Sequence, residues 1–214
     1  MSENLKGIHK DQIQSYVLYL LANSCMPTLL HLKPSSVVSV NKKFFSDRAK
    51  FFTGLVNEIN YFDCNYSVLY EDEKVLFLMV YHSQFLYQVL MQDQNRPFLN
   101  DNGYCFYNYI VENSIKRLQI RYIEFMEDHK EFPHELGILL GYPIEDVEGY
   151  IKNNGQNYLF SGFWKVYHDI ERAEKVFESF RMVREAAMEI IYSGRELRQL
   201  ENSFALLNAF TRMN

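Results

Sequence analysis

The sequence contains few residues that would break it into separate units. Only five of its 214 residues are proline and nine are glycine, and no stretch is rich in proline, glycine or serine. Internal repeats and low-complexity tracts are also missing from the sequence. Because linkers between domains usually have such compositions, residues 1–214 are predicted to form a single domain.

Cysteine is scarce. The chain has three cysteines, Cys25, Cys64 and Cys105, and none of them lies close to another in the sequence. A disulfide-stabilised scaffold of this size needs more cysteines in pairs, and a zinc site needs a spacing such as CxxC. The sequence therefore argues against both, and the thiols are expected to be free and reduced.

Basic residues are fewer than acidic ones. The chain has 22 basic and 27 acidic residues, which gives a net charge of −5. The densest basic cluster, Lys116, Arg117 and Arg121, lies beside Glu112 and Glu124. Nucleic-acid binders need a basic face to neutralise phosphates, and peripheral membrane proteins need basic residues beside apolar ones. We therefore expect neither nucleic acid nor a membrane as a partner.

Long apolar runs and a targeting segment are not visible either. The N-terminal sequence MSENLKGIHKDQ is polar and has no small-residue cleavage site. The apolar run from Val17 to Ala22 is too short to span a bilayer and is typical of part of a helix. These features predict a soluble, cytoplasmic protein.

Several motifs of well-known chemistry are missing. The sequence contains no GxGxxG, GxxxxGK[ST] or GxSxG, so nucleotide-binding loops and a serine-hydrolase elbow are not supported. A zinc-protease helix reads HExxH, but after His134 and Glu135 the required histidine is replaced by Ile138. No metal site is predicted.

Aromatic residues are abundant, with 16 tyrosines and 17 phenylalanines against one tryptophan. Tyrosine can bury its ring while its hydroxyl remains in water. The excess therefore has two interpretations, a broad half-buried surface or a cleft lined by rings that holds a ligand.

Apolar periodicity predicts the secondary structure. Helical spacing covers residues 9–24, 46–59, 83–92, 107–125, 133–140, 143–153, 170–190 and 197–207, and Pro27 and then Pro34 are expected to end the first helix. Strand patterns cover 36–40, 66–70, 75–81 and 158–167, with Gly162 as a bulge in the last strand and a hairpin between the second and third. The predicted fold is α+β, with a small, mainly antiparallel sheet of about four strands covered by seven or eight helices.

Three stretches are distinctive: CMPTLLHLKPSS at 25–36, FPHELGILLGYPIEDVEGYI at 132–151 and GFWKVYHDI at 162–170. With these motifs the chain resembles, over nearly its whole length, the DUF3793 family of uncharacterised proteins from anaerobic bacteria. The matching residues are Cys25, Pro27, Thr28, Leu29, Lys33, Pro34, Pro133, His134, Glu135, Gly141, Tyr142, Pro143, Asp146, Val147, Trp164, Lys165, Val166 and Tyr167. The sequence departs from the family pattern at Met26, where a small residue is expected, and at His168, where glycine is expected. The resemblance implies one DUF3793-like domain and no particular reaction.

Cys25, His134 and Glu135 are the candidates for catalysis. His134 either supports the entrance of a helix through internal hydrogen bonds or serves as an acid, base or ligand contact. Cys25 is predicted at the C-terminal end of a helix, where the helix dipole disfavours a thiolate. It is interpreted as a structural or ligand-contacting thiol, a nucleophile paired with a histidine, or a metal or haem-iron ligand.

Lys33, His134, Tyr142, Lys165 and Tyr167 are the candidates for ligand binding. Their cations and rings would line a pocket for an anion if the motif segments fold against one another. The alternative is that Lys165 is solvated and that its neighbours in the predicted strand are core.

Three hypotheses about function remain open. The first is a ligand-binding or accessory protein of anaerobic metabolism, which holds a small anionic or aromatic ligand, a haem or flavin cofactor, or a redox partner. The second is an enzyme of acyl or thiol transfer that uses Cys25 with His134. The third is a protein–protein interaction module whose excess of tyrosine and phenylalanine forms an exposed contact patch.

Overall fold

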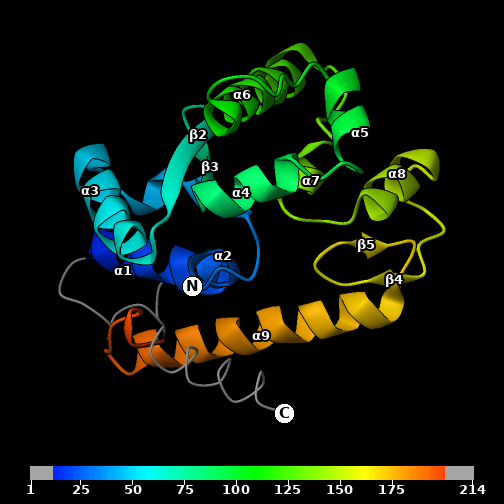
Figure 1. Ribbon diagram of the computed structural model, residues 1–214. Coiled ribbons are helices and arrows are strands. Elements are labelled where there is room, and N and C mark those ends of the chain that lie inside the picture. The colour runs from blue at the N-terminus through cyan, green and yellow to red at the C-terminus, as the bar shows by residue number, and fades with distance from the viewer. Residues whose placement is uncertain (1–11, 201–214) are drawn as a thin grey trace.

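The computed structural model describes residues 12–200, and they form an α+β fold (Figure 1). The prediction of the fold class is therefore confirmed. The helices in this part of the chain are α1 (Gln12–Leu20), α2 (Met26–Leu29), α3 (Arg48–Ile59), α4 (Ser83–Leu90), α5 (Arg96–Asp101), α6 (Ile110–Asp128), α7 (Leu136–Leu139), α8 (Ile144–Lys152) and α9 (Ile170–Tyr192). The strands are β1 (Ser35–Asn41), β2 (Asn65–Glu71), β3 (Val75–Tyr81), β4 (Phe160–Ser161) and β5 (Lys165–Val166).

The main sheet has the strand order β1-β3-β2, and both pairings are antiparallel. The central strand β3 has the sequence VLFLMVY, which is apolar at every position. Such a strand is expected where both faces of a sheet are covered. Strands β2 and β3 form the predicted hairpin, with a register shift between Val68 and Tyr70.

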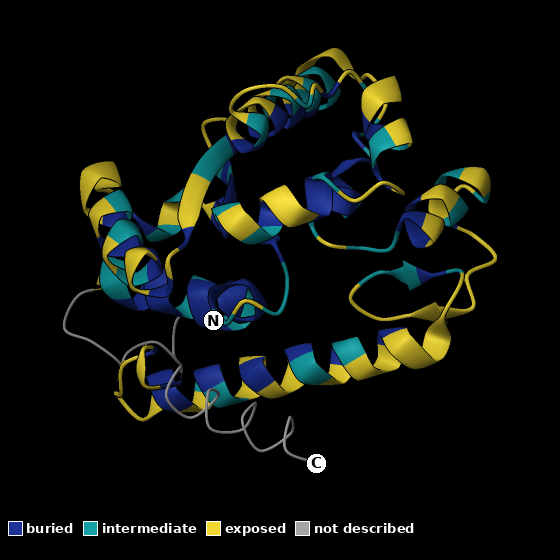
Figure 2. Cartoon of the chain, viewed as in Figure 1, coloured by how far each residue is buried: buried dark blue, intermediate teal, exposed yellow. Residues whose placement is uncertain are grey.

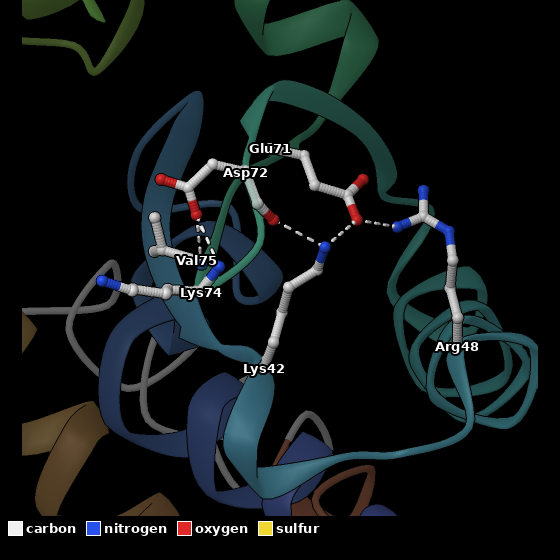
Figure 3. A network of polar contacts seen from close by, with 6 residues as sticks. All are labelled: Lys42, Arg48, Glu71, Asp72, Lys74 and Val75. Atoms are coloured by element: carbon white, nitrogen blue, oxygen red, sulfur yellow. Dashed lines mark hydrogen bonds and ion pairs between the residues drawn. The ribbon is translucent and has the colours of Figure 1, made fainter.

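A network of polar contacts closes the β2–β3 hairpin (Figure 3). The carboxylate of Asp72 accepts hydrogen bonds from the main-chain amides two and three residues further on, each at 2.7 Å. These bonds are the main reason that the pKa of Asp72 is lowered. Next to it, Glu71 accepts from Lys42 Nζ at 2.7 Å and from Arg48 Nη1 at 2.5 Å, which ties the turn after β1 and the beginning of α3 to the hairpin.

Hydrophobic cores lie on the two faces of the main sheet. One core joins α1, α2, α3 and the second half of α9, and it includes Met26, Phe51 and Val183. The other joins α4, α6, α7 and α8, and it includes Leu86 and Leu118. Burial of this kind contributes about 25 cal/mol per Å² of apolar surface, so the sheet with its two helical layers is the stable body of the molecule.

The first half of α9 leaves this body. Its second half packs on α2 and on the π-helical turn Leu21–Cys25. Its first half lies beneath the β4–β5 hairpin (Figures 1 and 2). There Ala173 and Phe177 of α9 form a small third core with Val166 and Trp164 of the hairpin.

The prediction of a single strand at 158–167 is wrong. The segment is a tight hairpin, in which only Phe160–Ser161 and Lys165–Val166 pair. Gly162 lies in the turn rather than in a bulge. A Cβ atom there would come within 2.3 Å of the Phe177 ring, so the close approach of α9 requires glycine.

The first helical region also differs from the prediction, because Pro27 does not end it. The chain passes through the π-helical turn Leu21–Cys25 into α2, and Pro27 lies in the first turn of α2, where an amide hydrogen is not needed. Helix α5 was missed. The predicted start of the first helix and residues 201–207 of the predicted last helix lie outside the described residues.

No helix within residues 12–200 has the length and hydropathy needed to cross a lipid bilayer.

Candidate functional site

Parts of the three motif stretches meet at a stacked pair of rings. Tyr142, just before α8, stacks on Trp164 of the hairpin turn, with ring centroids 4.8 Å apart and planes inclined by 25°. The indole Nε1 of Trp164 donates a hydrogen bond of 2.7 Å to Oδ2 of Asp146 in α8. These contacts fix the hairpin against the beginning of α8.

Asp146 anchors this junction from a buried position. Its Oδ1 accepts hydrogen bonds from the main-chain amides of Tyr167 at 2.7 Å and His168 at 3.1 Å. Together with Trp164, three donors satisfy one carboxylate, as a buried charge requires. Asp146 therefore joins the end of β5 to α8 and is not free to bind a ligand.

A hollow of about 300 Å³ lies between the end of α2, the beginning of α8, the hairpin and the first half of α9. We call it the Lys33 cleft. Lys33, Tyr142, Glu145, Trp164, Arg172 and Phe180 are among the residues that line it. Its volume is at the lower end of the range typical of small-molecule sites.

The backbone positions Lys33 at this cleft. After α2 the chain turns with His31 in the left-handed region, and the carbonyl of Pro27 accepts from the amides of Leu32 at 2.7 Å and Lys33 at 3.2 Å. On the other side, Gly141 has φ +84°, and a Cβ atom there would lie 2.6 Å from Cδ of Pro34. The glycine thus lets the segment that carries Tyr142 approach the Lys33 turn closely.

Lys33 is partly buried, and its ammonium group is unpaired. Its Nζ lies 5.8 Å from the ring centroids of both Tyr142 and Phe180. Between residues 12 and 200, no carboxylate or carbonyl lies within hydrogen-bonding or ion-pair distance of it. Burial lowers the pKa of Lys33 to about 8, because the charged form loses water, and the nearby Cys25 thiol offsets this only in part.

The other charges at the cleft differ in how they are used. The Asp169 carboxylate caps α9 by accepting from the amide of Arg172 at 3.0 Å. The guanidinium of Arg172 and the carboxylate of Glu145 are exposed, and neither has a side-chain partner among the residues that the structure describes. Helix α8 has Pro143 at its N-cap position, and no side chain caps its first amides.

A second hollow, of about 390 Å³, lies on the other side of the Tyr142–Trp164 stack. We call it the His134 hollow, and His134, Tyr150, Phe163 and Lys165 line it together with Tyr142 and Trp164. The His134 ring lies 5.5 Å from the ring of Phe132 and 5.6 Å from that of Tyr150. Burial is the main reason that the pKa of His134 is lowered, so the neutral ring is favoured.

Lys165 belongs to the His134 hollow and has its own partners. Its Nζ donates a hydrogen bond of 2.6 Å to the carbonyl of Gly155 and lies 5.0 Å from the ring of Tyr158. Tyr167 lines neither hollow. Its Cβ lies where Gly149 leaves room for it, and its hydroxyl is buried with no hydrogen-bond partner among residues 12–200. The predicted binding residues are therefore divided among three places, with Tyr142 shared by both hollows.

Glu135 is fully buried and fully engaged. Its carboxylate accepts from Arg121 Nε at 2.5 Å and Nη2 at 3.3 Å, and the Tyr104 hydroxyl lies 3.5 Å away. A buried carboxylate with a two-pronged arginine partner holds α6 and α7 together. The catalytic role suggested for Glu135 stays a prediction, and the contacts supply a structural reason for its presence.

Cys25 is also fully buried, in the π-helical turn Leu21–Cys25. Burial raises the pKa of its thiol to about 12, so almost none of it is thiolate at neutral pH. Its neighbour Met26, where a small residue was expected, is accommodated in the core with no exposed surface. His168, where glycine was expected, uses its amide to bind Asp146 and lines the Lys33 cleft.

Sequence reasoning missed Arg172, Phe180 and the Asp146–Trp164 bond. Arg172 and Phe180 lie in a helix whose pattern was recognised, but only the packing of α9 beneath the hairpin shows that they reach the cleft. Asp146 carried a signal, since it occurs in a motif and follows Pro143 at the beginning of a helix. Its partner, however, is 18 residues away.

Comparisons with known proteins place the chain in a family without assigning it a reaction. A search of curated proteins and a search of solved structures both gave no match. The family model described as "Protein of unknown function (DUF3793)" matches residues 21–201, which include all three motif stretches. The chain therefore belongs to the DUF3793 family.

Proposed function

We propose that the protein binds a small anionic ligand with a planar part in the Lys33 cleft. The observation that carries this proposal is the ammonium group of Lys33, which is partly buried among rings and has no counter-charge in the described chain. Folded proteins normally pair such charges, because an unpaired buried charge costs stability. An anion bound in the cleft would supply the missing charge.

The rings of the cleft support the planar part of the ligand. Tyr142, Trp164 and Phe180 all line it, and Tyr142 and Trp164 are held rigidly by their stack and by the bond from Trp164 to Asp146. Rigid aromatic faces favour a flat ligand, because little side-chain freedom is lost on binding. A volume of about 300 Å³ favours a single-ring compound over a haem.

The experiment is a thermal-shift and calorimetric screen of the full chain. The compounds are inorganic phosphate, single-ring aromatic carboxylates and phosphates, flavin mononucleotide and haem. A ligand present at one hundred times its Kd stabilises the folded state by about 2.7 kcal/mol. We expect such stabilisation from a single-ring anion.

The matched variants are Lys33→Met and Lys116→Met, which remove the same charge inside and outside the cleft. Lys116 is exposed on α6, away from the cleft. We expect ligand stabilisation to be lost in Lys33→Met and retained in Lys116→Met. Equal ligand affinity in the two variants, or no stabilisation by any anion in the screen, would contradict the proposal.

A second candidate function is self-association through the β4–β5 hairpin, and a specific observation favours it. Leu159 is 57% exposed and Phe163 is 46% exposed, and both lie on the same short hairpin. Exposed apolar side chains gathered on one short segment often mark a protein–protein contact. Light scattering after size exclusion should show a dimer that Leu159→Ser with Phe163→Ser abolishes, and a monomer of the unmodified chain at every concentration argues against this function.

A further inference from the structure

Most lysines whose contacts the structure defines have a carboxylate or carbonyl partner. Lys33 has neither within residues 12–200, and Lys43, which lies over the Phe44 ring, is exposed rather than set in a cleft. Lys42 pairs with Glu71, Lys130 with Glu124 and Lys175 with Glu171, while Lys165 donates to a carbonyl. The Lys33 amine instead faces the rings of the cleft, and a deprotonated amine there would have its lone pair available. We propose that Lys33 is a nucleophile that forms an imine with a small aldehyde or ketone carrying a carboxylate or phosphate.

The environment raises the fraction of this amine that is in the reactive, neutral form, although the charged form remains the majority at neutral pH. An amine must lose its proton before it can attack a carbonyl, and removal from water is one way in which proteins activate lysine. With a pKa of about 8, about a quarter of Lys33 is neutral at pH 7.5. An ordinary lysine, with a pKa of about 10.4, is neutral in only about one molecule in a thousand.

The reaction is balanced by the loss of water alone. The lone pair of Nζ attacks the carbonyl carbon, and the electron pair of the C=O bond moves to oxygen. A proton then passes from nitrogen to oxygen, giving a carbinolamine. The nitrogen lone pair forms the C=N bond as the hydroxyl leaves with a further proton as water. No oxidant or reductant is required.

The groups around Lys33 select the class of carbonyl compound. Arg172, on α9, is the other cation that lines the cleft, and the described chain gives its guanidinium no partner, so it is placed to hold a carboxylate or phosphate. Glu145 from α8, with Asp169 and His168 from the segment before α9, also lines the cleft. This inference rests on the proposed function, since the anion must first occupy the cleft.

The test uses the full chain with pyridoxal 5′-phosphate, an aromatic aldehyde that carries a phosphate, and with pyruvate, each followed by borohydride reduction. Peptide mass mapping then measures how fast each lysine is labelled. The neutral fraction of Lys33 exceeds that of an ordinary lysine by about two hundredfold, but a less basic amine is also a weaker nucleophile. We expect Lys33 to be labelled at least about tenfold faster than Lys116 or Lys165, and labelling at the same rate overturns the inference.

Two controls separate this inference from the proposed function. Lys33→Arg should abolish the fast labelling, while Lys165→Arg should retain it. Peptide mapping of the unmodified chain already compares the labelling rates of its lysines, so the inference can be tested even if a variant misfolds. Pyridoxine 5′-phosphate has an alcohol in place of the aldehyde and can bind but cannot form an imine. Its stabilisation of the chain without selective trapping of pyridoxal phosphate at Lys33 would support the proposed function and overturn the imine.

Discussion

The Lys33 cleft and the His134 hollow share the wall formed by Tyr142 and Trp164, but they treat their charges differently. In the His134 hollow, Lys165 is satisfied by the chain itself, through the Gly155 carbonyl. In the Lys33 cleft, the ammonium has no carboxylate partner within residues 12–200 and contacts rings instead. A charge that the fold does not satisfy is more informative about ligand binding than the size of the hollow in which it lies.

Loss of Asp146, which holds Trp164 in the wall between the two hollows, should have the largest effect on stability. Asp146→Ala leaves the indole Nε1 of Trp164 and two main-chain amides without their acceptor. Since each hydrogen bond to a charged group is worth about 1.5–3 kcal/mol and the three are not additive, we expect a loss of about 4 kcal/mol of unfolding free energy. Urea denaturation followed by circular dichroism measures it.

Glu145→Ala is the matched control for Asp146→Ala, because it removes an exposed carboxylate from the adjacent position of α8. It should change stability by less than about 0.5 kcal/mol. Equal losses of stability in the two variants would show that the contacts of Asp146 do not hold Trp164 in place, and the two hollows would then lack a fixed common wall.

Lys33→Met should stabilise the protein, which is unusual for a substitution at a partly buried residue. The pKa of Lys33 falls to about 8 in the folded state from an ordinary 10.5, so the unfolded chain binds its proton more tightly. By linkage, this difference in pKa lowers the free energy of unfolding. The loss has its full size below pH 8 and disappears as the pH rises from about 8 to 10.5. We expect a gain of about 2 kcal/mol at pH 7, allowing for partial solvent screening, and no gain near pH 10.5 in thermal unfolding.

Lys165→Met should have the opposite sign, because Lys165 is paired. It loses a hydrogen bond of 2.6 Å and leaves the Gly155 carbonyl without that donor. We expect destabilisation of about 1 kcal/mol, measured under the same conditions as Lys33→Met. If both lysine variants shift the melting temperature in the same direction, the contrast between the hollows is wrong.

The smallest effect should come from His134. Burial lowers its pKa below the ordinary value of 6.5, so the unfolded state takes up the proton first. Stability should therefore decrease as the pH falls through about 6.5. The variant His134→Phe should weaken this acid dependence, and an unchanged pH profile between pH 7 and pH 5 would show that the ring is not desolvated.

Local sequence patterns predicted most helices and the β2–β3 hairpin because the repeat of apolar residues is a local property. They failed for residues 158–167, since the glycine at 162 is required by the close approach of Phe177, which is distant in sequence and belongs to α9. They failed at Pro27 because proline both ends helices and suits their first turn. In each case the deciding contact or choice lay outside the local pattern.

The candidate site was predictable in its members but not in its arrangement. Lys33, Tyr142, His134 and Lys165 were chosen from motifs, and the structure places Lys33 in one hollow, His134 and Lys165 in the other, and Tyr142 between them. Sequence identifies which residues carry charge, but pairing depends on long-range geometry. Whether these residues bind a ligand stays a prediction.

The single tryptophan of the chain stands in the partition between the two hollows. Its indole emission is therefore an intrinsic optical signal from this location, without contribution from a second tryptophan elsewhere. A planar compound entering on the Lys33 side would quench that emission by stacking, and titrations could be followed in the unlabelled, unmodified protein. The same signal, compared between Lys33→Met and Lys165→Met, would show whether quenching arises in the Lys33 cleft or in the His134 hollow.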